Sequence, residues 1–409
     1  MRIESSIMTS QQAIELEHKY GAHNYHPLPI VISRGEGVFV WDVEGKRYYD
    51  FLAAYSAVNQ GHCHPRIIQA LIDQASKLTL TSRAFHNDVL GEYEEFMTKL
   101  FGFDKLLPMN TGVEACETSV KLARRWGYDV KGVEKYKAKI IFAEGNFWGR
   151  SIAAVSASTD PSSFTGFGPF TPGFETIPYN DIPALEKALE DPNVVAFMVE
   201  PIQGEAGVVI PDEGYLTKVS ALCKSKKVLL IADEVQTGLA RTGKMLACDH
   251  ENVKPDILVL GKALSGGVFP VSAVLANDEI MLTIKPGEHG STYGGNPLAC
   301  KVAMTAVQVL LDENLADNAH HLGEMLRTEL RNIKSDRIKL VRGKGLFNAI
   351  IIEEKDGIDA MDVCLQLKDN GLLAKPTHGH IIRLAPPLVI NEDQLLECAS
   401  IIRRTIENL

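Results

Sequence analysis

Long apolar runs and cysteine pairs are both missing from this sequence. No apolar stretch approaches the roughly 18 residues that a membrane-spanning helix needs. The first twenty residues lack the apolar core of a signal peptide and the arginine-rich, acid-poor composition of a transit peptide. The seven cysteines are scattered, odd in number and without a CxxC pair, which disfavours a disulfide framework or a zinc site. We therefore expect reduced thiols and a cytoplasmic protein, mitochondrial only if a presequence has been removed.

Positive charge and nucleotide-binding motifs are also scarce. The chain has 42 lysine and arginine residues against 52 aspartate and glutamate residues, a net charge of −10. This balance disfavours nucleic acid and anionic membranes as partners, but it allows a local basic pocket for a small anion. No GxxxxGKS or GxxxxGKT motif occurs, and "GEGVFV" and "GKGLFN" lack the third glycine of GxGxxG. In "GHCHP", His62 and His64 are too few to bind a metal, and the flanking Gly and Pro favour a turn.

Apolar runs alternate with helical patterns in the middle of the chain. "AKIIFAEG", "VVAFMVEP", "VLLIADEV" and "DILVLGKAL" have the pattern of buried strands, and stretches such as "DIPALEKALED" and "GYLTKVSALCKSKK" have helical periodicity. This alternation predicts an α/β fold with a mostly parallel sheet that is covered on both faces. After residue 296, a long helical stretch, strand-like "RIKLVRGKGLFNAIIIEE" and a final helix predict a smaller α+β domain.

The stretch "TGVEACETSVKLARRW" contains a well-marked helix start. Thr111 and Glu114 have the spacing of a capping box, and the charges at both ends of the stretch suit the helix dipole. Gly112 allows a ligand to approach the backbone, and the free amide groups of a helix start suit a phosphate. The alternative is a helix that is well capped for stability alone, and this stretch by itself does not separate the two.

Asp233 and Lys262 each end an apolar strand pattern, one strand-helix-strand unit apart. We expect both at the carboxyl ends of adjacent parallel strands, where ligands of such sheets bind. A buried carboxylate needs a cationic partner, so one interpretation is a plain ion pair between the two residues. The other is that they contact different ends of pyridoxal phosphate. That cofactor uses a lysine for its aldehyde, a carboxylate for its ring nitrogen and a helix start for its phosphate.

Six motifs together resemble the class III, fold type I aminotransferases that depend on pyridoxal 5'-phosphate: "MNTGVEACETSVKLARRW", "FWGR", "EPIQGEAGV", "LLIADEVQTGLARTGK", "DILVLGKALSGGVFPVSAV" and "HGSTYGGNPLAC". The resemblance covers nearly the whole chain. It implies a large cofactor-binding domain at residues 51–295 with a mostly parallel seven-stranded sheet, and a small α+β domain at residues 296–409. It also implies an N-terminal segment at residues 1–50 that packs with the small domain, and a homodimer with shared active sites.

The resemblance implies which residues carry the chemistry. Lys262 matches the lysine that forms a Schiff base with the cofactor and later moves a proton on the substrate. Asp233 matches the partner of the pyridine nitrogen, which keeps that nitrogen protonated. Gly112 and Val113 match the backbone that binds the phosphate.

Further cofactor contacts follow from the same resemblance. Phe147 matches the aromatic side chain stacked on the pyridine ring, and Gln236 matches a residue near the phenolic oxygen. Thr292 matches a threonine that reaches the phosphate of the neighbouring subunit's cofactor. Glu200 matches an acidic neighbour of the cofactor. Without the family pattern, Phe147 would be interpreted as a core residue.

"HNYHPLP", "AAYSAVNQGHCHP", "GNFWGRS" and "HGHIIRLAPPLVI" point, within the class, to the branch that uses ornithine and 2-oxoglutarate. Tyr25, Tyr55 and Arg150 match residues that hold the α-amino and α-carboxylate groups of ornithine. Arg383 matches the arginine that binds the α-carboxylate of glutamate, and Glu205 matches the acid that masks Arg383 until a diacid arrives. The alternatives are that the two tyrosines are ordinary half-buried residues and that Arg383 is a surface residue on an edge strand.

The expected reaction moves the terminal amino group of L-ornithine to a 2-oxo acid by a ping-pong mechanism, which would belong to ornithine, proline and arginine metabolism. One alternative is another terminal-amine aminotransferase, acting on acetylornithine or 4-aminobutyrate. The other alternative is a non-catalytic relative that keeps only the fold.

Overall fold

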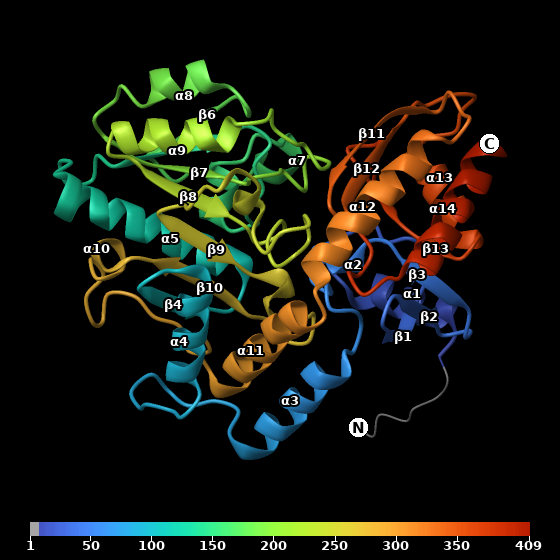
Figure 1. Ribbon diagram of the computed structural model, residues 1–409, viewed down its shortest axis with the longest axis horizontal. Coiled ribbons are helices and arrows are strands. Elements are labelled where there is room, and N and C mark those ends of the chain that lie inside the picture. Colours follow the sequence, from blue (N-terminus) through green and yellow to red (C-terminus); the bar gives the residue numbers. More distant parts are fainter. Residues whose placement is uncertain (1–7) are drawn as a thin grey trace.

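The computed structural model describes residues 8–409, which form three β-sheets (Figure 1). Residues 1–7 lie outside the described residues. They are the start of the expected N-terminal segment and of the stretch in which no targeting signal was expected. The largest sheet lies on one side of the molecule, and the first and last parts of the chain lie together on the other side. Within the described part of the chain, no helix is both long and apolar enough to cross a membrane.

The largest sheet has seven strands in the order β4-β10-β9-β8-β7-β5-β6. All neighbouring pairs from β9 to β6 are parallel, and β10 is antiparallel to both of its neighbours. The four apolar runs form β5, β7, β8 and β9, so the expected α/β fold with a mostly parallel sheet is confirmed. The strands are β4 (Lys105–Met109), β5 (Lys139–Ala143), β6 (Phe174–Ile177), β7 (Val194–Val199), β8 (Leu229–Asp233), β9 (Ile257–Leu260) and β10 (Ser272–Ala276).

Both faces of this sheet are apolar because alternate side chains of each strand meet different helices. Ile140 of β5 belongs to a core shared with α5, whereas its neighbour Ile141 belongs to a core shared with α8 and α9. Strands that are apolar on both faces are typical of a covered parallel sheet. The helices of this part are α4 (Leu90–Phe101), α5 (Gly112–Trp126), the π-helix η1 (Gly127–Lys131), α6 (Ile152–Ser156), α7 (Pro161–Phe164), α8 (Ile182–Ala188), α9 (Tyr215–Ser225), the 3-10 helices η2 (Ala247–Glu251) and η3 (Lys262–Ser265), and α10 (Asp278–Met281).

The N-terminal strands share a sheet with a strand from the far end of the chain. The order is β1-β2-β3-β13, and Tyr49 of β3 lies beside Leu372 of β13 in a parallel pair. These elements are α1 (Ser10–Tyr20), β1 (Ile32–Glu36), β2 (Phe39–Asp42), β3 (Arg47–Asp50), the single turn α2 (Ala53–Ser56), α3 (Pro65–Lys77) and β13 (Leu372–Leu373). Figure 1 accordingly shows the blue start of the chain against its red end.

The C-terminal sheet has the order β11-β12-β15-β14, with all three pairs antiparallel. Its elements are α11 (Pro297–Asp312), α12 (Leu315–Arg331), β11 (Ile338–Lys344), β12 (Phe347–Ile352), α13 (Ala360–Asp369), β14 (Lys375–Thr377), β15 (Ile381–Leu384) and α14 (Glu392–Glu407). The long helix α11 packs against α3, α4 and η3 rather than on this sheet. The domain boundaries at residues 50 and 295 stay a prediction.

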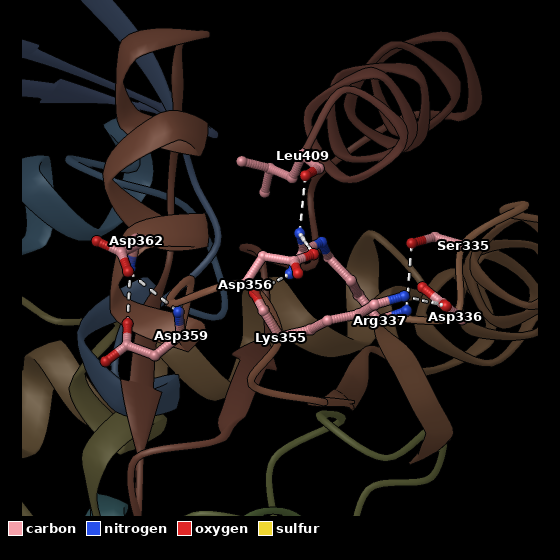
Figure 2. A network of polar contacts seen from close by, with 8 residues as sticks. All are labelled: Ser335, Asp336, Arg337, Lys355, Asp356, Asp359, Asp362 and Leu409. Carbon is pink, nitrogen blue, oxygen red and sulfur yellow. Dashed lines mark hydrogen bonds and ion pairs between the residues drawn. The ribbon is translucent and has the colours of Figure 1, made fainter.

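A buried arginine fastens the end of the chain to the C-terminal sheet (Figure 2). Arg337 donates hydrogen bonds of 2.7 Å to the carbonyl oxygen of Lys355 and of 2.7 Å to that of Leu409. Only 5% of Arg337 is exposed, and a more distant carboxylate, Asp356, lies 3.5 Å away. The contact therefore holds the segment after α14 against the loop that follows β12.

Candidate active site

A cavity of about 220 Å³ lies where β8, the start of α5 and the start of η3 meet. The structure brings six of the seven expected cofactor-binding residues together around it, and with them Glu200, the expected acidic neighbour of the cofactor. The residues that line the cavity are Gly112, Val113, Cys116, Phe147, Trp148, Gly149, Glu200, Asp233, Val235, Gln236 and Lys262. The cavity therefore lies at the carboxyl ends of parallel strands, where ligands of such sheets bind.

The start of α5 forms one wall of this cavity. The expected capping box is present, with the Thr111 amide donating to Glu114 at 2.7 Å and the Glu114 amide donating to the Thr111 hydroxyl at 3.4 Å. The amides of the next residues have no partner inside the helix and suit an anion. A Cβ atom on Gly112 would lie 3.0 Å from a methyl group of Val235, so a side chain there would crowd the cavity. These features fit a cradle for a phosphate.

Asp233 ends β8 as a buried carboxylate. It accepts a hydrogen bond from the Val235 amide at 3.1 Å and one from the Cys116 thiol at 3.5 Å. Burial raises the pKa of Asp233 above its usual value. No ion pair joins Asp233 to Lys262 among residues 8–409, so the alternative of a plain ion pair is wrong. A carboxylate in this position can accept the N–H of a protonated ring nitrogen.

Glu200 is a second buried acid beside Asp233. It accepts hydrogen bonds from the amides of Phe147 at 2.9 Å and Gly204 at 3.2 Å. Burial, followed by the nearby charge of Asp233, raises the pKa of Glu200 to about 8. Burial therefore favours the protonated form of Glu200, and the two amide donors oppose this shift without cancelling it.

The sequence pattern predicted that Lys262 ends a strand, and this is wrong because β9 stops at Leu260. Gly261 follows, and Lys262 opens the 3-10 turn η3 with a φ of +44°, which turns its side chain into the cavity. Burial lowers the pKa of the amine below its usual value, although Glu205 opposes this shift. Its amine makes no hydrogen bond within the described residues. The structure thus presents an amine that loses its proton easily and is free to react.

Arg383 and Glu205 form an ion pair at the edge of the cavity. The Arg383 guanidinium lies 2.6 Å from Oε1 of Glu205, and the Gln236 amide donates to the same oxygen at 3.3 Å. Although burial acts to raise it, the Arg383 charge holds the pKa of Glu205 below its usual value. Strand β15 lies between β12 and β14, and only 5% of Arg383 is exposed, so the edge-strand alternative is wrong. The buried Nε of Arg383 has no partner in the described residues, which leaves a donor for a carboxylate ligand.

The other expected substrate residues differ in position. The ring of Tyr55 lies under Arg383, 4.9 Å from the guanidinium carbon. Tyr25 is 71% exposed and close enough to influence the pKa of Tyr55, which burial raises. Arg150 is exposed beside the Phe147 ring, at 5.5 Å, and Thr292 is exposed in the loop before α11. Within one chain, Tyr25, Arg150 and Thr292 therefore do not line the cavity.

Four cavity residues were not expected from the sequence: Cys116, Trp148, Gly149 and Val235. Position alone was a usable signal for two of them. Cys116 lies one helical turn after Gly112, so the two share a face of α5. Val235 lies in the turn directly after β8, two residues beyond Asp233. Gly149 has a φ of +141°, and a Cβ atom there would lie 2.5 Å from Val113, which only the folded structure reveals.

Comparison with known proteins supports this picture. The family model described as aminotransferase class-III matches residues 20–406. The "Ornithine aminotransferase, mitochondrial" of Rattus norvegicus is 68% identical over 99% of this chain and 92% of the rat protein. A solved ornithine aminotransferase from Toxoplasma gondii, described with partial occupancy of PLP at its active site, superimposes with a TM-score of 0.97 at 52% identity, covering 98% and 95% of the two chains. An acetylornithine aminotransferase from Elizabethkingia anophelis superimposes with a TM-score of 0.90 at 60% identity, covering 98% and 100%.

Proposed function

The chain belongs to the class-III aminotransferases, and we propose that it is an ornithine δ-aminotransferase. It would transfer the terminal amino group of L-ornithine to 2-oxoglutarate and yield glutamate 5-semialdehyde and L-glutamate. The observation that carries the substrate assignment is the Glu205–Arg383 pair: Glu205 accepts a hydrogen bond from the cavity residue Gln236, and Arg383 lies over the ring of Tyr55. It provides a positive charge that can be masked for one substrate and exposed for the other.

The cavity residues fit pyridoxal phosphate, the cofactor of this family. When bound, the cofactor supplies an aldehyde that reacts with amines and a ring that accepts the electrons of the broken C–H bond. The amides at the start of α5 would hold its phosphate, Asp233 would hold its ring nitrogen and Phe147 would cover its ring. The lowered pKa of Lys262 suits a group that attacks a carbonyl and then carries a proton from one carbon to another.

Two substrates of different charge would use the same pocket in turn. With Glu205 in place, Arg383 is neutralised, and the uncharged stem and terminal amine of ornithine can pass it toward Lys262. The α-amino and α-carboxylate groups of ornithine would then lie near Tyr55, Tyr25 and Arg150. When Glu205 moves aside, Arg383 would bind the α-carboxylate of 2-oxoglutarate through its fork of N–H donors.

Three further properties belong to the proposal. The exposed position of Thr292 suits a residue that completes the phosphate site of a partner subunit, so the active form would be a homodimer with shared sites. The reaction would connect ornithine with proline and arginine metabolism. The sequence predicts the cytoplasm, whereas the rat relative is named as mitochondrial, so fractionation of native cells would test the location.

Acetylornithine aminotransferase is the second candidate, because the solved Elizabethkingia protein of that name is 60% identical to this chain. The two functions differ at the far end of the pocket. Ornithine has a free, charged α-amino group that can donate a hydrogen bond to the Tyr55 hydroxyl. Acetylation removes the charge of this group and two of its three N–H donors. The position of Tyr55 beside Arg383 therefore favours ornithine.

The test is a half-reaction on the purified enzyme. Ornithine, acetylornithine and 4-aminobutyrate are added separately without a 2-oxo acid, and the absorbance of the bound cofactor is followed. We expect ornithine to discharge the absorbance fastest, and Lys262→Ala to bind cofactor without turnover. Faster reaction with acetylornithine would select the second candidate. A wild-type chain that stays colourless with added cofactor would contradict the enzyme assignment.

A further inference from the structure

The turn that carries Tyr55 is left-handed. Ala53, Ala54, Tyr55 and Ser56 have φ angles of +48°, +48°, +58° and +71°, and none of them is glycine. Consecutive side-chain-bearing residues in this region are strained, because the Cβ atom crowds the following carbonyl oxygen. Such strain persists only where the surroundings enforce it, and it gathers at functional sites. The residues that hold this turn therefore merit a functional assignment of their own.

Asp50, at the end of β3, holds the start of the turn. One of its carboxylate oxygens accepts hydrogen bonds from the amides of Leu52 and Ala53, both at 2.9 Å. The other oxygen lies 2.7 Å from Nε2 of His62. Asp50 is 7% exposed, so these bonds are shielded from water. The side-chain hydrogen bonds of Asp50 in the described residues thus all go to the turn and to His62.

His62 is itself fixed to the N-terminal sheet. Its amide and its carbonyl group pair with Gly37 at 2.8 Å and 3.0 Å. Its ring lies on Gly35 of β1 so closely that a Cβ atom on Gly35 would lie 2.8 Å from the ring. Contacts therefore run without a break from β1 through His62 and Asp50 to the amide of Ala53, two residues before Tyr55.

We propose that Asp50 and His62 are positioning residues that set the substrate selectivity of the enzyme by fixing the ring of Tyr55 under Arg383. The Tyr55 carbonyl also accepts a hydrogen bond from Gln236 at 3.3 Å, so the turn is held from both sides. This inference rests on the proposed function, since it requires Tyr55 to recognise ornithine. It also gives His62 of the "GHCHP" motif a role other than metal binding.

The same motif offers a matched control. His64 forms a similar contact, with its Nε2 lying 3.0 Å from Glu313, but this contact joins the start of α3 to the end of α11. It does not touch the turn. A loss of activity that results from lower overall stability should appear in both histidine variants. A loss of selectivity for ornithine should appear only in the His62 variant.

The test compares His62→Ala, Tyr55→Phe, the double variant and the control His64→Ala. We expect Tyr55→Phe and His62→Ala each to lower kcat/KM for ornithine about tenfold, mainly through KM, with 2-oxoglutarate kinetics almost unchanged. The double variant should be no worse than Tyr55→Phe, because His62 acts through Tyr55. His62→Gln, which places an N–H donor near the position of Nε2, should restore most of the loss. Asp50→Asn keeps the acceptor for both amides and serves if His62→Ala does not fold.

The possible failures are distinguishable. If Tyr55→Phe alone leaves ornithine kinetics intact, the proposed role of Tyr55 is wrong, and the positioning role is wrong with it. If Tyr55→Phe is impaired but the effects of the two substitutions multiply, or if 2-oxoglutarate kinetics fall equally, His62 has a general structural role only. Equal loss of selectivity in His64→Ala would also overturn the inference.

Discussion

Replacing Ala54 with glycine should stabilise the protein, whereas alanine-to-glycine changes usually destabilise. Ala54 is exposed and has a φ of +48°, a conformation that costs an L-residue roughly 1–2 kcal/mol and glycine almost nothing. Glycine loses more chain entropy on folding, which costs about 0.5–1 kcal/mol. The net expectation is a gain of about 0.5–1 kcal/mol in the free energy of unfolding.

Ala70, in the middle of α3, is the matched control because its backbone is ordinary right-handed helix. Ala70→Gly should lose about 1 kcal/mol. Urea unfolding of both variants, followed by tryptophan fluorescence, compares their midpoints at equal slope. If Ala54→Gly is destabilised as much as Ala70→Gly, the turn is not strained in the protein. The proposal that Asp50 and His62 restrain it would then have no basis.

Three further outcomes are expected. Glu205→Gln leaves the charge of Arg383 unmasked, so steady-state kinetics should show KM rising about tenfold for ornithine and falling for 2-oxoglutarate. Parallel changes in both KM values would contradict the proposal that Glu205 masks Arg383. Burial raises the pKa of Glu200 in the folded protein to about 8, whereas in the unfolded chain it has its ordinary value near 4.5. The folded state therefore binds this proton more tightly, and the stabilisation that results is complete below pH 4.5 and is lost as pH rises through about 8. The cofactor-free protein should therefore lose stability between pH 5 and 8, by up to about 1.4 kcal/mol per pH unit, and Glu200→Gln should flatten that slope in urea titrations. Arg337→Met removes two charge-assisted hydrogen bonds, so it should lower the free energy of unfolding by about 2–3 kcal/mol and speed amide hydrogen exchange in α14. Substitution of the exposed Arg404 by methionine should change neither quantity.

The sequence was sufficient for the large sheet and for the chemistry at its edge. Val-, Ile- and Leu-rich runs that are apolar on both faces identify buried parallel strands, and polar residues after such runs mark the ligand edge. The capping box at Thr111 and Glu114 located the start of α5 to the residue. Local patterns were enough here because each one depends on neighbours in the sequence.

Other features depended on contacts that no local pattern encodes. Lys262 follows an apolar run, yet its place in a 3-10 turn depends on a positive φ that the sequence around it does not announce. The left-handed turn that contains Tyr55 consists of alanine, tyrosine and serine, residues without a preference for that conformation. The burial of Arg383 follows from the pairing of β15 with β12 and β14, and its partners Glu205 and Tyr55 lie far from it in the sequence.

The two halves of the active site lie in different stretches of the chain. The residues of the cavity fall between Gly112 and Lys262, and the sheet beneath them is complete at Ala276. Arg383 is made more than a hundred residues later, in a strand near the C-terminus. During synthesis from the N-terminus, the chain therefore acquires the means to grip its cofactor well before it acquires the means to choose between substrates.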